Sequence, residues 1–192
     1  MIFIKLPAQF LPSMNTKEKW LSTGYQAFAR EGSHGIKVES LSRIVGKNKS
    51  TFYHHFFSTD IFLEDLTMRH LEQAKVMAQR LKASQDLKDL IEGMLFHQED
   101  LFFNRYLRVE RDVPIFESCF QETNAFVGDA FLQTWSTILE FNGNSQLARL
   151  FLKICVDNFF LRLSPKTLNA KWLEQYFIEL RDLVRAFMEA HP

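Results

Sequence analysis

The sequence contains little that would bend, kink or cross-link the chain. Its 192 residues include seven glycines, five prolines and two cysteines. The cysteines, Cys119 and Cys155, are isolated, with no Cys-x-x-Cys pair and no neighbouring histidine that would complete a metal site. We therefore expect two small buried thiols in a reducing compartment, which favours the cytoplasm, and we predict neither a metal site nor another cofactor.

Long apolar runs are also missing. The first four residues are apolar, but Lys5, Pro7 and Pro12 interrupt them well short of a signal-peptide core or a membrane span. No other stretch approaches such a length, so the sequence predicts no membrane partner. Residues 14–16 read as the approach to a helix, and we expect residues 1–13 to be a loose arm or an artefact of start-codon choice.

The residues that dominate instead favour helices. Hydrophobic residues make up 46% of the chain, which is enough to fill a core, and helix formers such as Leu, Glu, Lys and Ala are frequent. We therefore predict an all-α protein. Twenty phenylalanines, most of them at helical spacing, predict either a strongly aromatic core or an aromatic-lined cavity, and composition alone does not separate the two.

Charge is distributed unevenly, although the formal net charge is zero. Residues 1–60 contain eight Lys and Arg against four Asp and Glu, a net charge of +4. The remainder contains 15 against 19, a net charge of −4. A basic N-terminal segment on an acidic body indicates that contact with a polyanion is confined to one end of the protein.

Helix-start and helix-stop residues divide the chain into nine predicted helices. They span about residues 16–30, 38–45, 49–55, 59–83, 86–104, 105–112, 114–141, 145–163 and 167–190. The second and third are short and flank a tight turn, in which Gly46 ends one helix and Asn48 caps the next. Val38, Leu41, Ile44 and Val45 are expected to share one face of the second helix, and Phe52 and Phe56 are expected to point inward. Two short helices across a glycine turn are typical of a helix-turn-helix.

This stretch resembles the DNA-binding signature of TetR-like transcriptional regulators. Phe28 is followed four residues later by Gly32, and the predicted recognition helix closes on the block Tyr53-x-x-Phe56. The match covers about residues 17–63. Either block alone would be unspecific, but the two together at this spacing are typical of the family.

The resemblance implies a domain organisation and a function. It implies an N-terminal three-helix helix-turn-helix DNA-binding domain, residues 14–60, and a C-terminal helical bundle for ligand binding and dimerisation, residues 61–192. A homodimer of this kind binds a pseudo-palindromic operator in double-stranded DNA. We therefore expect a ligand-responsive regulator, a repressor released by a small hydrophobic or aromatic effector, in which the helix over residues 59–83 connects the two domains.

Three positions depart from the family pattern. Lys37 stands where a capping Thr or Ser is usual, which weakens the cap but offers a cation to phosphate. Lys47 replaces a small apolar turn residue. Thr59 replaces a usual lysine at the start of the fourth helix and removes one expected backbone contact, for which Lys47 and Lys49 compensate in charge.

Duplex DNA is held by cations and hydrogen-bond donors that contact phosphates, and it is read by a few side chains that reach base edges. The polar side of the predicted recognition helix and its flanks offers both kinds of group. The predicted DNA-binding residues are Lys37, Lys47, Asn48, Lys49, Ser50, Thr51, Tyr53 and His54. Without the surrounding signature, the same residues would be interpreted as a solvated helix face.

The predicted helix over residues 114–141 is apolar over most of its circumference, so it must be buried on several sides. The resemblance implies an effector cavity beside it, with Asn124 or His97 orienting a flat or hydrophobic ligand. The predicted pocket residues are Phe96, His97, Phe103, Phe120, Asn124, Phe131 and Trp135. An ordinary core explains any one of these residues equally well.

The last two predicted helices carry more apolar surface than one small body needs to bury. Their stripes consist of Leu147, Phe151, Ile154, Cys155 and Phe159, then Trp172, Leu173, Tyr176, Phe177, Leu180, Val184 and Phe187. In the family, the corresponding helices of two subunits pair as a four-helix bundle, and a monomer would leave a hydrophobic patch exposed.

Two other interpretations fit parts of the sequence. An enzyme on a helical bundle would use His97 with Glu99 or Asp100. The sequence lacks a nucleophile elbow, a glycine-rich phosphate loop and a metal-ligand set, so we assign no catalytic residues and do not predict an enzyme. A helical adaptor that has kept the fold without DNA binding is compatible with the three departures from the family pattern.

Overall fold

The structure is a computed structural model, and it describes residues 15–141 and 144–190. Within these ranges it contains helices and no strand, which confirms the predicted all-α class. The elements are α1 (Thr16–Glu31), the 3-10 helix η2 (Gly32–Gly35), α2 (Val38–Val45), α3 (Lys49–Phe56), α4 (Thr59–Lys82), α5 (Leu87–Phe96), α6 (Gln98–Val109), α7 (Pro114–Ile138), α8 (Ser145–Arg162) and α9 (Ala170–Ala190). The predicted arm over residues 1–13 lies outside the described residues.

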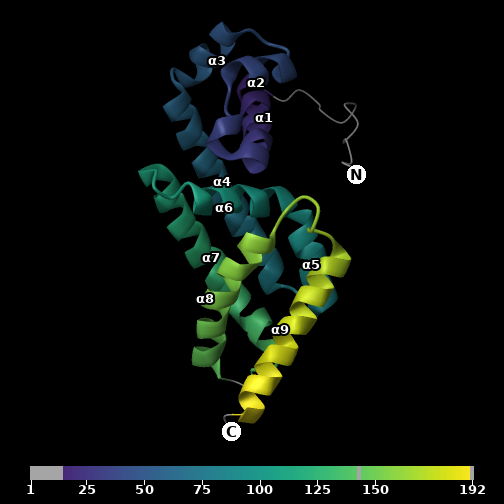
Figure 1. Cartoon of the computed structure of the whole chain (residues 1–192). Helices are drawn as coiled ribbons and strands as arrows, with labels where there is room; N and C mark the ends of the chain where they lie inside the picture. The colour runs from purple at the N-terminus through teal and green to yellow at the C-terminus, as the bar shows by residue number, and fades with distance from the viewer. Residues whose placement is uncertain (1–14, 142–143, 191–192) are drawn as a thin grey trace.

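The helices form an elongated molecule with a small unit at one end (Figure 1). The helices α1, α2 and α3 surround the start of α4, which then runs into the larger body. There α4 packs along α7, and the long helices α8 and α9 lie on the face shown in Figure 1. The connector predicted over residues 59–83 is thus present as α4.

Side-chain caps set several of the helix starts where the sequence predicts them. The side-chain oxygens of Asn15, Asn48 and Ser58 accept hydrogen bonds from backbone amides in the first turns of α1, α3 and α4. Lys37 makes no such bond at the start of α2, in agreement with the weakened cap expected there. Gly46 ends α2 in the left-handed region, at φ 70° and ψ 33°.

The predicted break between residues 104 and 105 is wrong. The chain bends instead at His97, which ends α5 and precedes α6 with φ −95° and ψ 27°. Nδ1 of the buried His97 side chain donates to Oδ2 of Asp100, 2.7 Å away in the first turn of α6. This contact satisfies a polar side chain at the bend, whereas the sequence around residue 104 contains no glycine or proline to end a helix.

The face predicted to be shared by Val38, Leu41, Ile44 and Val45 is only partly buried, because the side chain of Ile44 is 62% exposed. Only Val38 and Leu41 of α2 are buried, so the short helix packs through its first turns and leaves the last one open. Phe52 and Phe56 are fully buried, as predicted.

Two hydrophobic clusters hold the structure together. One combines Trp20, Phe28, Phe52 and Phe62 of the small unit with Phe103 and other side chains of α6 and α7. It crosses the predicted division after residue 60, so the two parts share a core at their junction. The other cluster lies in the larger body and gathers side chains of α4, α5 and α6 with those of α7, α8 and α9.

Candidate nucleic-acid interface and ligand cavity

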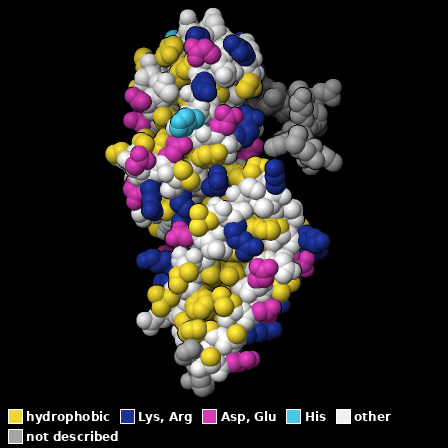
Figure 2. All heavy atoms as spheres, viewed as in Figure 1, with side chains coloured by type: hydrophobic (Ala, Val, Ile, Leu, Met, Phe, Trp, Pro, Cys, Tyr) yellow, Lys and Arg dark blue, Asp and Glu magenta, His cyan; other side chains and the backbone are white. Residues whose placement is uncertain are grey.

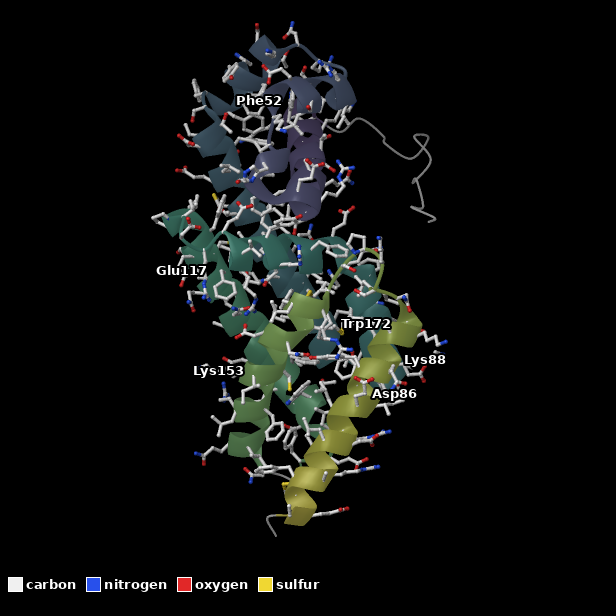
Figure 3. The ribbon with its side chains drawn as sticks, in the orientation of Figure 1. Phe52, Asp86, Lys88, Glu117, Lys153 and Trp172 are labelled. Carbon is white, nitrogen blue, oxygen red and sulfur yellow. The ribbon has the colours of Figure 1, made fainter. Side chains whose placement is uncertain are left out.

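The helix α3 is anchored by its two buried phenylalanines. The ring of Phe52 contacts that of Trp20 at a centroid distance of 5.3 Å and that of Phe62 at 5.0 Å. Phe56 contacts Phe62 at 4.7 Å. Figure 3 shows Phe52 inside the small unit, between α3, α4 and α1. Because one face of α3 is fixed to α1 and α4 in this way, the opposite face is held outward.

The predicted DNA-binding residues, apart from Lys37, lie on α3 and in the turn before it. All except Thr51 are exposed, and Thr51 is half-buried. The exposed members are Lys37, Lys47, Asn48, Lys49, Ser50, Tyr53 and His54. They come from the start of α2, the α2–α3 turn and α3, so they lie together at the far end of the molecule (Figure 1). The structure brings the predicted set together on one surface.

Hydrogen bonds already occupy part of this surface. Oδ1 of Asn48 accepts from the Thr51 amide at 2.9 Å and from the Thr51 hydroxyl at 2.8 Å. Lys49 forms an ion pair with Glu39 of α2, and this bond lowers the pKa of the Glu39 carboxyl. Lys37 and Lys47 have no ion pair within the described ranges. The free cations of the surface therefore flank α3, and Lys49 must exchange Glu39 for phosphate or base if it contacts DNA.

A buried polar cluster joins the small unit to the body. The Tyr25 hydroxyl of α1 donates to Oδ1 of Asp100 at 2.5 Å, and its oxygen lies 2.7 Å from Nδ1 of His70 on α4. Since the Tyr25 proton goes to Asp100, Nδ1–H of His70 donates to the Tyr25 oxygen, and Nε2 of His70 is left as an acceptor. Oδ2 of Asp100 accepts from His97. The Tyr25 hydroxyl thus links α1 to both α4 and α6.

A second contact ties the end of α1 to the end of α6. Both carboxylate oxygens of Glu110 lie 3.1 Å from the Ser33 amide that donates to them, and the Tyr106 hydroxyl donates to the Arg30 carbonyl at 2.7 Å. Gly32 permits the approach, because it adopts φ 64° and a side chain there would meet the Glu110 carboxylate. The small unit is therefore bonded to α6 and the residue after it at two points.

A cavity of about 560 Å³ opens in the larger body. Its walls come from α4, α6, α7, α8 and α9, with a smaller contribution from α5. The apolar part of the lining includes Met77, Leu81, Leu101, Phe120, Phe131, Trp135, Phe159, Phe160, Tyr176 and Phe177. This volume lies within the range of sites that hold small organic ligands.

Solved structures share this arrangement over nearly their whole length. One from Rhodococcus sp., assigned to the TetR family of transcriptional regulators, aligns with 88% of this chain and 97% of its own at 16% identity, with a TM-score of 0.57. Another from Mesorhizobium loti MAFF303099, assigned to the same family, aligns with 91% and 98% at 14% identity, also with a TM-score of 0.57. No protein-family model matches the sequence, and no curated protein matches it either.

The chain has the TetR-type fold. The fold expected from the sequence resemblance is therefore confirmed, with the helix-turn-helix at one end and the helical body at the other. At these identities the likeness establishes the fold, and the function must be argued from the surfaces of this chain.

Within this TetR-type fold, four of the seven predicted pocket residues line the cavity. These are Phe120, Asn124, Phe131 and Trp135, all on α7. The other three do not line it, and each has another role, so their assignment to the pocket is corrected.

Phe96 is 71% exposed at the end of α5, beneath the guanidinium of Arg80. His97 is buried at the α5–α6 bend and bonded to Asp100. Phe103 is stacked between Phe28, at 4.2 Å, and His70, at 4.4 Å, in the junction between the small unit and the body.

Apart from Asn124, the polar residues of the cavity were not predicted. Asp100, Asn104 and Arg108 lie one helical turn apart on α6 and line one wall, and His70 of α4 lies close to them. The spacing of four residues is a visible signal in the sequence. It was missed because the expected helix break after residue 104 placed Asn104 and Arg108 on different helices.

The histidine–carboxylate pair proposed for an enzyme is used in packing. Both His97 and Asp100 are buried, and the two oxygens of Asp100 are bonded to Tyr25 and His97. Within the described ranges no group of three or more His, Cys, Asp or Glu side chains is placed to hold a metal ion. In the same ranges no helix has the length and apolarity needed to cross a membrane.

Part of the outer surface of α8 and α9 is apolar. Its exposed hydrophobic side chains are Leu150, Ile154, Leu161, Leu183 and Phe187. Figure 2 shows hydrophobic side chains gathered over the lower part of the molecule, where α8 and α9 lie in Figure 1. Other members of the predicted stripes, such as Cys155, Leu173 and Val184, are buried inside the subunit instead.

Proposed function

We propose that the protein is a ligand-responsive DNA-binding transcriptional regulator. In this proposal residues 14–60 read DNA, and residues 61–192 bind an effector and form a homodimer. The observation that supports it most strongly is the outward face of α3, which carries polar and cationic groups while Phe52 and Phe56 fix the helix from behind. A helix held in this way has the geometry needed to enter the major groove.

Each class of contact has residues suited to it. Lys37 before α2, Lys47 in the α2–α3 turn and His54 on α3 are assigned to phosphates. Lys49, Ser50 and Tyr53 lie along the exposed face and are assigned to base edges and adjacent backbone. Asn48 retains its side-chain amide nitrogen for DNA, because only its oxygen is engaged in the cap.

The apolar surface of α8 and α9 supports the homodimer. In a two-fold dimer formed there, the two recognition helices would be related by the same axis and would meet successive grooves of a pseudo-palindromic operator. A repressor acts by occupying that operator, and such a protein works in the cytoplasm beside the DNA.

The cavity supports effector control. A ligand shifts the population of conformations only if it binds one of them more tightly. The walls of this cavity include His70 and Asp100, which are bonded to Tyr25 of the small unit. A ligand that displaces α4 or α6 would therefore alter the position of α1 and the spacing of the two recognition helices.

The test is a selection of genomic fragments on the immobilised protein, followed by gel-shift titration of the enriched sequence. The triple variant Lys47→Ala/Lys49→Ala/Tyr53→Ala should bind this sequence at least about 100-fold more weakly, because it loses phosphate and base contacts together. Wild-type affinity should also fall steeply as salt is raised.

The matched control changes three exposed lysines of the body, Lys82→Ala/Lys88→Ala/Lys171→Ala, and should bind as the wild type does. The free energy of unfolding of both triple variants should lie within about 1 kcal/mol of the wild-type value, since all the substituted sites are at the surface. Equal DNA affinity of the two variants would overturn the assignment of α3. Enrichment of no sequence at all would favour the adaptor interpretation.

A further inference from the structure

The side chain of Arg108 is held in place at the wall of the cavity. Its guanidinium lies 4.7 Å from the ring centroid of Phe120 and 4.6 Å from that of Phe160. Its Nη1 atom forms an ion pair with Asp157 of α8. Two aromatic rings and one carboxylate therefore fix both the plane and the direction of this cation before any ligand arrives.

The remaining nitrogens of Arg108 are unused. Nε and Nη2 are buried and have no hydrogen-bond partner. These two nitrogens form one of the parallel forks through which a guanidinium binds both oxygens of a carboxylate. Burial lowers the pKa of Arg108, and nearby Asp157 opposes this effect, so the cation is poorly solvated where it stands. An anion that hydrogen-bonds to the fork would satisfy two buried donors that have no partner in the structure.

The charged residues at the opening of the cavity also favour an anionic ligand. The exposed charged residues of the lining are Arg111, Asp129, Arg149, Lys153 and Asp157. Asp129 pairs with Arg149, and Asp157 pairs with Arg108. Among the residues that the structure describes, Arg111 and Lys153 have no acidic partner, so the opening carries an excess of positive charge. Figure 3 shows Lys153 on α8.

The buried part of the cavity lining is mostly apolar. Met77, Leu81, Leu101 and Trp135 belong to the lining and are buried and apolar. Two unpartnered acceptors, Oδ1 of Asn104 and Nε2 of His70, belong to the same lining. An apolar body of a ligand would fit against these walls, and a hydroxyl or amide donor on it would meet an acceptor there.

We propose that the cavity binds a carboxylate attached to an apolar body, with the carboxylate on Nε and Nη2 of Arg108 and the body between α4, α7 and α9. This inference rests on the proposed function, since it specifies the ligand of the cavity assigned there. An aliphatic chain and an aromatic ring system are both compatible with the walls. The shared feature is the carboxylate, and the experiment separates the two kinds of body.

The test compares matched acids and amides by isothermal titration calorimetry at neutral pH, on protein without DNA. The aliphatic pair is octanoate and octanamide, and the aromatic pair is 1-naphthylacetate and 1-naphthylacetamide. In at least one pair the acid should bind about tenfold or more tightly than its amide, because only the acid makes two charge-assisted hydrogen bonds. The acid that binds more tightly shows whether the apolar part of the ligand is aliphatic or aromatic.

Three variants assign the effect to the fork. Arg108→Gln should bind acid and amide equally, and Arg108→Lys, which keeps the charge without the fork, should retain only part of the preference. Arg111→Gln removes an exposed cation of the same opening and should keep most of the preference for the acid. If neither acid binds the wild type, or if Arg108→Gln and Arg108→Lys both keep the full preference for the acid, the proposal is overturned.

A gel shift with the selected DNA separates this inference from the proposed function. Acid binding that lowers DNA affinity supports both. If the acid binds through Arg108 but leaves DNA affinity unchanged, the ligand assignment stands and the effector role fails. If the protein binds and releases DNA with another compound while neither acid binds, the regulator stands and the carboxylate assignment fails.

Discussion

The hydroxyl oxygen of Tyr25 on α1 lies 2.5 Å from Oδ1 of Asp100 on α6 and 2.7 Å from Nδ1 of His70 on α4. One side chain of the small unit thus hydrogen-bonds to two residues that line the cavity. Tyr25 also stacks on Phe103, with a centroid distance of 4.5 Å. The junction is therefore polar at its centre and aromatic around it, and loss of a single hydroxyl leaves two buried groups without partners.

Tyr25→Phe should lower the free energy of unfolding by about 1–3 kcal/mol, because Asp100 and His70 lose a partner in a buried site. Urea denaturation followed by circular dichroism measures this change. The control is Tyr106→Phe, which removes a hydroxyl that bonds the Arg30 carbonyl at an exposed position and should cost less than about 1 kcal/mol. Equal losses in the two variants would contradict the role assigned to the cluster.

His70 should make stability depend on pH. Burial lowers the pKa of His70 from 6.5 to about 4, although the charge of Asp100 acts in the opposite direction. The unfolded chain therefore takes up this proton first as pH falls. The contribution of His70 to stability is complete above about pH 6.5 and is lost progressively down to about pH 4, a total of about 3 kcal/mol.

Unfolding free energies measured across this pH window for the wild type and His70→Asn give the contribution as a difference. His70→Asn keeps a donor toward Tyr25 without a group that titrates here, so its stability should fall less. His34→Asn, at an exposed position, should follow the wild type. A difference between wild type and His70→Asn that stays constant from pH 6.5 to pH 4 would refute the expectation.

The sequence predicts the helix-turn-helix far better than the cavity. Local signals define the first: Asn48 caps α3, Gly46 ends α2, and the spacing of Phe52 and Phe56 identifies the buried face. Each of these acts within a few residues of the chain, so a single sequence reveals it. The same reasoning placed the outward face correctly, although its contact with DNA stays a prediction.

The cavity depends on contacts between distant segments, which periodicity does not contain. The phenylalanines of α5 and α6 illustrate the difficulty: Phe96 is at the surface and Phe103 is in the junction, although both occupy apolar helical positions. Arg108 was overlooked because a half-buried arginine between two rings has the same sequence pattern as a surface arginine. Its partner rings come from α7 and α8, far along the chain.

The contact between α1 and α4 requires a glycine at position 24. A Cβ atom there would lie 2.3 Å from Cζ of Phe62, whose ring is fully buried against Phe52 and Phe56. Gly24→Ala should therefore destabilise the protein by about 2 kcal/mol, even though alanine is the better helix former. Thermal and urea unfolding measure the change.

Gly128, in the middle of α7, provides the matched control, because a Cβ atom there would meet nothing within 4 Å. Gly128→Ala should stabilise the protein by about 0.5–1 kcal/mol through helix propensity alone. Changes of the same sign in the two variants would show that space around Phe62 does not decide the outcome.

Substitutions of Asn48 separate folding from DNA contact. Asn48→Ala removes the acceptor for the Thr51 amide and should cost about 1 kcal/mol of unfolding free energy. Asn48→Asp keeps an acceptor at the helix start, so its stability should match that of the wild type within a few tenths of a kcal/mol.

The same Asn48→Asp variant places a negative charge where phosphates are expected, and DNA affinity should fall about tenfold. Fluorescence anisotropy with the selected DNA measures this effect, and chemical denaturation measures the stability of the same samples. If Asn48→Asp binds DNA as tightly as the wild type, the start of α3 does not face the duplex.

The apolar surface of α8 and α9 should be required for dimer formation. Ile154 and Leu161 are 71% and 83% exposed in the single chain, more than expected for large aliphatic residues that have no partner. Ile154→Glu or Leu161→Glu would bury an unpaired carboxylate in the dimer and should raise its dissociation constant by about 100-fold or more.

Val109→Glu, at a 66% exposed position outside this surface, serves as the control. Sedimentation velocity over a range of concentrations should show dimers of the wild type and of Val109→Glu, and only monomers of the two α8 variants. Dimers that survive both substitutions, or that dissociate only on Val109→Glu, would place the subunit contact elsewhere on the molecule.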